Sequence, residues 1–156
     1  MERQTDINRK VIVFQLNNEE YAVSVKQVGS IERLQPITRV PQTADFVKGV
    51  INLRGVVTPI IDLRVRFGIH PIDFKDSTRI IIVHMDELEV GLIVDAANDV
   101  IDIPDSSIEP APEVVGTVDV DYIEGVTKLE NRLLILLDLQ KVLSHVDIES
   151  IYSVEG

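Results

Sequence analysis

The stretch Lys48-Gly-Val-Ile-Asn-Leu-Arg-Gly-Val-Val-Thr-Pro-Ile-Ile-Asp-Leu-Arg64 decides the fold, because a second copy of it follows 76 positions later. The second copy is Glu124-Gly-Val-Thr-Lys-Leu-Glu-Asn-Arg-Leu-Leu-Ile-Leu-Leu-Asp-Leu-Gln140. The residues that match identically are, in the first copy, Gly49, Val50, Leu53, Asp62 and Leu63. A repeat at about half the chain length predicts two copies of one structural unit.

Arg54 does not recur in the second copy, where Glu130 stands at the same place. The shared fold therefore does not require an arginine there. A solvated turn residue is the simplest interpretation of Arg54. An arginine on a rigid, exposed turn is also a common anchor of protein interfaces, so we single out Arg54 as a candidate binding residue.

The motif itself predicts a strand, a tight turn and a second strand. Gly55 and Asn131 belong to the residue types that best tolerate a positive φ, which predicts hairpin turns at 54–55 and 130–131. The segment 133–137 by itself fits a helix or a strand, but Pro59 in the matching segment breaks helices and favours strands in both copies. Asp62 and Asp138 then follow the second strands and are expected to cap short helices, and Ile60 and Leu136 are expected in the core.

A further hairpin precedes the motif in each copy, and the two hairpins are 69 residues apart in the sequence. Segments rich in β-branched residues at 11–16 and 21–25 flank a turn at 17–20, and those at 79–84 and 90–94 flank a turn at 86–89. The proline-containing segment 102–122 is expected to be a loop. Residues 28–31 are expected to form a short helical turn, in which Ile31 corresponds to Val100 of the second copy.

The predicted fold class is mainly β, with two repeated units of about five short strands and a few short helices. The units span 11–67 and 80–143 of a single domain over 1–156, with loose ends. Five strands in an open sheet cannot bury both faces, so each unit is expected to curl into a small barrel. A groove lined by both units is expected between the barrels.

Composition and charge exclude several classes of function. The net charge of −11 argues against binding to nucleic acids or to anionic membrane surfaces, which require a basic face. The chain has no cysteine, which excludes disulfides and thiolate chemistry and is typical of a reducing compartment. The first residues lack the apolar run of a signal peptide, and no apolar stretch is long enough to span a bilayer. We therefore expect a cytoplasmic protein without membrane insertion.

Motifs of catalysis, metal binding and cofactor binding are missing from the sequence. The histidines His70, His84 and His145 are isolated and lack the spacing of metal ligands. Glycine-rich phosphate loops and nucleophile elbows are absent as well. The pairs Asp119/Asp121 and Asp73/Asp76 are candidates for acid–base chemistry, but surface charge is the favoured interpretation in an acidic chain. We expect no catalytic residue, no metal and no cofactor.

The motif at 48–64 resembles the signature of the CheW family, the bacterial chemotaxis coupling proteins. The likeness extends over about residues 11–143 and includes 38–41, 94–95, 99–100 and 110–112. It implies two SH3-like β-barrel subdomains and a non-enzymatic adaptor of two-component signalling. Such an adaptor joins the cytoplasmic tips of chemoreceptors to the C-terminal regulatory domain of the histidine kinase CheA. The resemblance also implies a monomer in isolation that becomes a ring or array member at the membrane.

The resemblance also implies site residues. The receptor-contact positions of the family fall on Val28, Ile31, Arg54 with the adjacent Gly55, and Val100. Ser30 stands where some members carry an acidic residue. Positions Gly49 and Val57 are linked to coupling in the family, either by contacting a partner such as the kinase or by holding the hairpin.

Two alternatives stay open at this point. The first is an adaptor of the same kind in a parallel chemosensory system, such as surface motility. The second is a small acid–base hydrolase that uses the loop aspartates, which would need a deep pocket with two carboxylates of different pKa.

Overall fold

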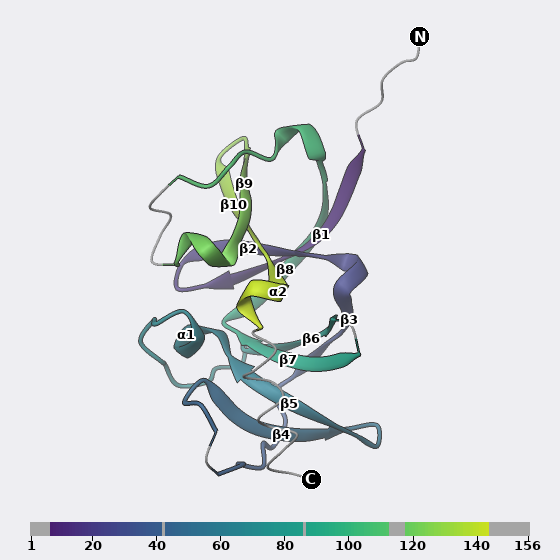
Figure 1. The fold of residues 1–156 in the computed structure, drawn as a ribbon, viewed down its shortest axis with the longest axis vertical. Coiled ribbons are helices and arrows are strands. Elements are labelled where there is room, and N and C mark those ends of the chain that lie inside the picture. Colours follow the sequence, from purple (N-terminus) through teal and green to yellow (C-terminus); the bar gives the residue numbers. More distant parts are fainter. Residues whose placement is uncertain (1–6, 42, 86, 113–117, 144–156) are drawn as a thin grey trace.

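A computed structural model describes residues 7–41, 43–85, 87–112 and 118–143. The fold is mainly β, with two five-stranded SH3-like subdomains and a few short helical turns, as predicted (Figure 1). The strands are β1 (Asn8–Leu16), β2 (Glu19–Ser24), β3 (Val28–Arg33), β4 (Val47–Leu53), β5 (Val56–Asp62), β6 (Arg79–Met85), β7 (Leu88–Val94), β8 (Ala96–Pro104), β9 (Ile123–Leu129) and β10 (Arg132–Leu137). The helical turns are η1 (Val25–Gln27), α1 (Leu63–Arg66), η2 (Asp105–Ser107), η3 (Val120–Tyr122) and α2 (Leu139–Val142).

The strands form two sheets with the same internal arrangement. Sheet I has the order β8-β1-β2-β10-β9, and sheet II has the order β3-β6-β7-β5-β4. Neighbouring strands are antiparallel except for one parallel pair in each sheet, β2 with β10 and β5 with β7. In Figure 1 sheet I occupies the upper half of the molecule and sheet II the lower half, with α1 and α2 near their boundary.

The prediction that 11–67 and 80–143 each form their own barrel is wrong. The hairpin β1–β2 of the first unit pairs with strands β8 and β10 of the second, and the hairpin β6–β7 of the second pairs with β3 and β5 of the first. The two units have thus exchanged their first hairpins. Exchange of an equivalent element makes the same backbone hydrogen bonds and buries the same faces, so the repeat alone does not distinguish the two arrangements.

The register of the strands confirms the equivalence between Ile31 and Val100. Ile31 of β3 lies opposite Ile81, and Val100 of β8 lies opposite Ile12. The partners Ile81 and Ile12 are themselves separated by the repeat offset of 69. Strands β3 and β8 therefore occupy the same edge position in the two sheets.

The turns and caps of the motif follow the sequence prediction with one difference. Arg54 (φ 53°) and Gly55 (φ 84°) both have positive φ, as in a type I′ hairpin. In the second copy the positive φ falls on Glu130 (φ 45°) and not on Asn131, for which it was expected. The capping prediction is confirmed: the carboxylate of Asp62 accepts the N–H of Arg64, and that of Asp138 accepts those of Gln140 and Lys141.

Two local predictions need correction. Residues 28–31 are not helical but begin strand β3, because Val28 to Arg33 complete a ladder with β6, and the helical turn is the preceding η1. The segment 102–122 is only partly loop. Strand β8 continues to Pro104 through pairing with β1, and η2 and η3 are short 3₁₀ turns.

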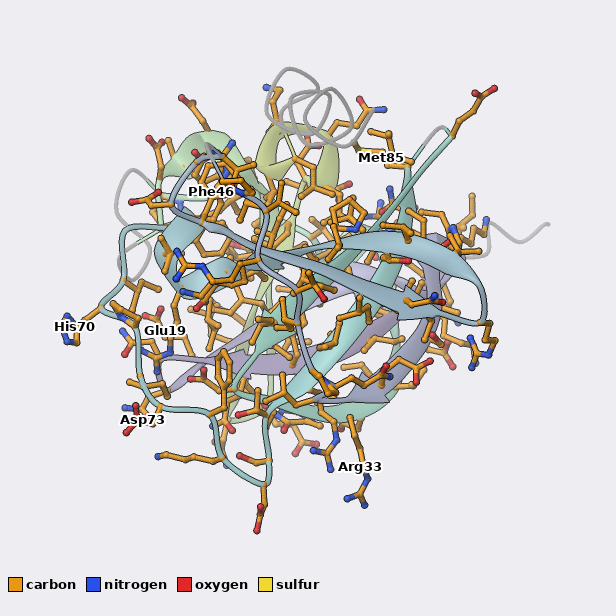
Figure 2. All side chains as sticks on the ribbon, turned by 90° about the horizontal axis from the view of Figure 1, so that it is seen from below. Glu19, Arg33, Phe46, His70, Asp73 and Met85 are labelled. Atoms are coloured by element: carbon orange, nitrogen blue, oxygen red, sulfur yellow. The ribbon has the colours of Figure 1, made fainter. Side chains whose placement is uncertain are left out.

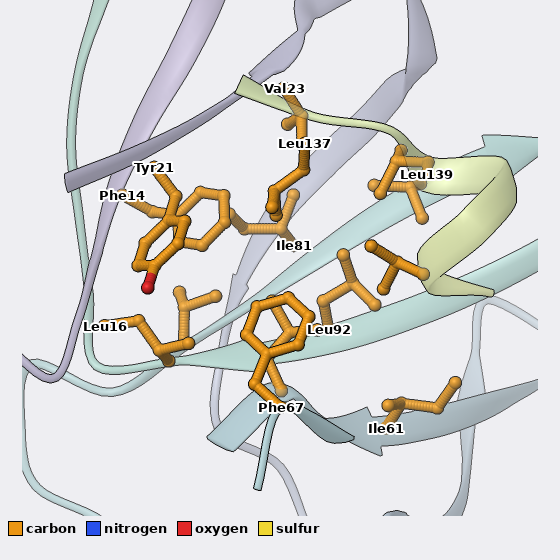
Figure 3. Close-up of a cluster of buried hydrophobic side chains, with 14 of the residues drawn as sticks. Phe14, Leu16, Tyr21, Val23, Ile61, Phe67, Ile81, Leu92, Leu137 and Leu139 are labelled. Atoms are coloured by element: carbon orange, nitrogen blue, oxygen red, sulfur yellow. The ribbon is translucent and has the colours of Figure 1, made fainter. Parts of the chain in front are cut away.

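Three apolar clusters fill the interior of the part of the chain that the structure describes. Leu136 belongs to a cluster of side chains from sheet I, and Ile60 belongs to a cluster of side chains from sheet II. Both predicted core residues are therefore buried. The largest cluster lies between the two sheets and includes Phe14, Tyr21, Phe67, Ile81 and Leu92 (Figure 3). The centre of the expected groove between the barrels is therefore filled by side chains.

Candidate functional site

Strand β3 forms an exposed edge of sheet II, and its side chains alternate between half-buried and exposed. Near its start Gly29 is an extra residue, since Val28 lies opposite Val83 and Ser30 lies opposite Ile82. A Cβ atom at Gly29 would overlap the imidazole of His84, so this bulge lets the histidine ring lie against the backbone. The bulge sets which side chains of β3 face outward.

Apolar side chains are exposed at the equivalent edges of the two sheets. The exposed fraction is 41% for Ile31 on β3 and 52% for Val100 on β8. Their cross-strand partners Ile81 and Ile12 belong to the cluster between the sheets, and opposite residues of a ladder share one face of a sheet. Val28 is half-buried and packs against the same cluster. The structure thus places Ile31 and Val100 at equivalent positions on the inter-sheet side of two edge strands, and Val28 packs on the same side of β3 as Ile31.

Arg54 reaches from the β4–β5 turn to strand β3. Its Nη2 lies 3.3 Å from Oε2 of Glu32, and the Ser30 hydroxyl donates a 2.8 Å hydrogen bond to the same oxygen. The side chain of Arg54 is 73% exposed and that of Glu32 only 17%. Arg54 is therefore a largely solvated turn residue whose one described ion pair directs its guanidinium toward the edge strand that carries Ile31.

Glu32 is the site residue that sequence reasoning missed. Ser30 and Glu32 stand two residues apart and so share one face of a strand, which would have been visible had 28–33 been recognised as a strand. The repeat offers a second signal, because Ile101 and Glu130 occupy the places of Glu32 and Arg54 in the other copy and cannot form this ion pair. The pair is thus specific to the first copy of the motif.

Gly49 and Val57, the two further positions in the motif, differ in their surroundings. Gly49 has a φ of 143°, and a Cβ there would overlap the carbonyl of Thr38, which forms a backbone bridge with Val50. Val57 is 44% exposed on β5, beside Val56 at 48%. Gly49 therefore holds the hairpin against the preceding segment, whereas Val57 is available for contact.

Arg64 and Asp95 form a hydrogen-bond network that connects the two sheets. Nε and Nη2 of Arg64 donate hydrogen bonds of 2.9 and 2.7 Å to the two oxygens of Asp95, and Nη1 donates one of 2.8 Å to the carbonyl of His70. The backbone N–H of Asn17 donates a further bond to Asp95. Burial raises the pKa of Asp95, but these hydrogen bonds and the charge of Arg64 outweigh it and lower the pKa below its ordinary value. The network fixes the start of β8, the strand that carries Val100.

The candidate residues for catalysis have other roles or lie apart. The carboxylate of Asp119 accepts the N–H of Asp121 and so caps η3. His70 and Asp73 extend outward from the ribbon (Figure 2). Among the described residues, no group of three or more His, Cys, Asp or Glu side chains is placed to hold a metal ion. Within the same part of the chain, no helix is long and apolar enough to cross a membrane.

Comparisons with known proteins assign the family. The model of the CheW-like domain matches residues 10–147. The chain is 50% identical to the chemotaxis protein CheW of Bacillus subtilis (strain 168) over 143 residues, which is 92% of each chain. It is 39% identical to that of Klebsiella aerogenes over 138 residues, covering 88% of this chain and 83% of the relative.

A solved structure agrees with these sequence matches. The scaffolding protein TtCheW from Thermoanaerobacter tengcongensis superposes with a TM-score of 0.83 at 38% identity, over 88% of this chain and 94% of that one. The fold, the repeated motif and these matches together show that the chain belongs to the CheW-like family of chemotaxis scaffold proteins.

Proposed function

We propose that this chain is a non-enzymatic chemotaxis adaptor that joins the cytoplasmic tips of chemoreceptors to the C-terminal regulatory domain of the histidine kinase CheA. The receptor site consists of Val28, Ile31, Arg54, Gly55 and Val100. The observation that carries this assignment is the placement of Arg54, which pairs with Glu32 on the strand that exposes Ile31. It puts a cationic anchor and an apolar contact on one edge.

The chemistry of this edge suits a helical partner. An amphipathic helix inserts its apolar residues at spacings of three and four onto an apolar surface. Ile31 and Val28 supply such a surface, and a largely exposed arginine held by one ion pair supplies directional hydrogen bonds to the partner. Removal of an arginine of this kind commonly costs on the order of 2 kcal/mol of binding free energy.

We propose that the kinase domain contacts strand β5 and not the β3 edge that forms the receptor site. Val56 and Val57 expose apolar area on β5, close to the β4–β5 turn but without a described ion pair or side-chain bond to β3. We take Val57 as the first candidate contact of the kinase domain, with Gly49 acting only through the backbone of the hairpin. The protein is cytoplasmic, is a monomer in isolation and becomes a ring or array member when it is recruited to the membrane-associated receptors. Its similarity to chemotaxis proteins of two bacteria favours chemotaxis over a parallel chemosensory system.

Two titrations test this proposal, one with a receptor cytoplasmic fragment and one with the C-terminal domain of CheA. Arg54→Ala is expected to weaken receptor binding about thirtyfold, which corresponds to about 2 kcal/mol. It should leave kinase binding and the melting temperature nearly unchanged, because the guanidinium of Arg54 is largely exposed and the Ser30 hydroxyl still donates to the Glu32 carboxylate.

Val57→Ala is the matched variant and should weaken only kinase binding. Lys141→Ala, an exposed substitution on α2, should affect neither titration. Equal receptor affinity of Arg54→Ala and the wild type would overturn the site. Failure of the wild type to bind the receptor fragment would overturn the adaptor function itself.

A further inference from the structure

Two arginines lie directly opposite each other at the end of the β3–β6 ladder. Arg33 of β3 pairs in register with Arg79 of β6. Like charges in directly opposite positions destabilise a sheet. The position is unusual in a chain with a net charge of −11, in which carboxylates outnumber basic side chains. The pair is therefore expected to lower the stability of the free protein.

The positive charge of the two arginines is not neutralised within the part of the chain that the structure describes. None of the ion pairs among the described residues includes Arg33 or Arg79. Nη1 of Arg79 donates hydrogen bonds of 2.7 and 2.9 Å to the carbonyls of Asp76 and Thr78. These carbonyls hold the guanidinium in place without cancelling its charge. Arg33 is exposed and extends away from the ribbon (Figure 2).

The surroundings of the pair form a shallow basic hollow of about 350 Å³. Lys75 lies in its lining, on a turn closed by bonds between Lys75 and Thr78, and Phe74 adds an aromatic surface that is 42% exposed. Asp76 is the carboxylate in the lining, against three basic side chains. The hollow therefore has the charge and shape to receive an acidic group from a partner.

The hollow is continuous with the edge that carries Ile31. Side chains of a strand alternate, so Ile31 and Arg33 belong to the same exposed row of β3. Two strand steps separate them by about 6.6 Å. One turn of a helix advances about 5.4 Å. A helix that runs along β3 with an apolar residue on Ile31 thus brings a residue one turn away to Arg33.

We propose that Arg33 and Arg79 extend the receptor site and select a receptor helix with an acidic residue one turn from the residue that contacts Ile31. This inference rests on the proposed receptor site and adds the chemistry of the partner. The carboxylate of that residue carries one negative charge, binds between the two opposed guanidinium groups and offsets half of their charge, and Phe74 covers one side of the contact. The repulsion within the free protein is relieved on binding.

The test is titration of a chemoreceptor cytoplasmic fragment at several salt concentrations with wild type, Arg33→Glu and the control Lys141→Glu, which makes the same change of charge on α2. Arg33→Glu is expected to weaken binding at least tenfold and to make the affinity less dependent on salt. Its melting temperature should hold or rise, since an acid opposite Arg79 replaces repulsion with attraction.

The outcomes separate this inference from the adaptor function. If Arg54→Ala weakens binding while Arg33→Glu binds as well as Lys141→Glu, the receptor site stands and the acidic extension is overturned. A fall in both stability and affinity for Arg33→Glu would give Arg33 a structural role and also overturn the extension. If the wild type does not bind the receptor fragment, both proposals fail.

Discussion

Nε of Arg66 donates a 2.8 Å hydrogen bond to the main-chain carbonyl of Val142, the residue that occupies the place of Arg66 in the second copy of the repeat. The same guanidinium lies 4.6 Å from the ring centre of Phe46 and 5.2 Å from that of Tyr122, and these two residues are also equivalent in the repeat. A residue that contacts its own counterpart lies close to the approximate two-fold axis relating the units. The contact between α1 and α2 therefore lies where the two repeat units meet.

Arg66→Lys is expected to lower the free energy of unfolding by about 1–2 kcal/mol, because an ammonium cannot stack between two rings and keep the same planar donor. Urea denaturation followed by circular dichroism measures the change. Arg54→Lys is the matched control, since the side chain of Arg54 is 73% exposed, and should shift stability by less than about 0.5 kcal/mol. Equal midpoints for the two variants would show that the stacking contributes little.

Asp95→Asn is expected to destabilise the protein at pH 7 by roughly 3 kcal/mol, because it removes the carboxylate that binds the nearly buried guanidinium of Arg64 through two hydrogen bonds and leaves only the weaker charge interaction with Asp62. The pKa of Asp95 is lowered in the folded state, so its contribution is complete above the unfolded value of about 3.9 and is lost as pH falls through the folded value.

Unfolding free energies of wild type and Asp95→Asn between pH 7 and 3 test this pH dependence. The difference should be constant down to about pH 5 and should shrink below about pH 4. A difference that grows toward acid would contradict the lowered pKa.

Gly49→Ala and Gly55→Ala should differ sharply, although both glycines have positive φ. A Cβ at Gly49 meets the backbone carbonyl of Thr38, which cannot move without breaking its bridge to Val50. We expect a loss of at least about 4 kcal/mol or failure to fold. A Cβ at Gly55 meets open space, so only the left-handed conformation costs energy, about 1–2 kcal/mol. Thermal melting of the two variants checks the order, and similar losses would contradict it.

Ile60→Ala and Leu136→Ala are each expected to cost roughly 2–5 kcal/mol, because both side chains are buried in the interior of a sheet. Each variant should unfold in a single transition. The exchanged hairpins and the large cluster between the sheets make either half depend on the other. Calorimetry decides, and two separated transitions in either variant would show that the sheets unfold independently.

The local elements could be predicted from the sequence because each follows from a few neighbouring residues. Pro59 identified strands in both copies of the motif, and Asp62 and Asp138 identified the caps of α1 and α2. The receptor-contact candidates came from resemblance, and Ile31 and Val100 proved to be equivalent through the register of β3 and β8. Glu32 was not predicted as a site residue, because 28–31 was predicted as a helical turn. Strand β6, with which this segment pairs, lies about 50 residues later in the chain.

The sequence by itself determined the repeat, the strand and turn pattern, the capped helices and the family, since these depend on residue type, local spacing and resemblance. Only the tertiary structure decided which hairpin joins which sheet, because equivalent hairpins offer the same hydrogen bonds and apolar faces to either partner. It also decided the contacts of charged side chains. The pairing of Arg54 with Glu32, the bidentate bond of Arg64 to Asp95 and the opposition of Arg33 and Arg79 all depend on strand register, which long-range packing sets.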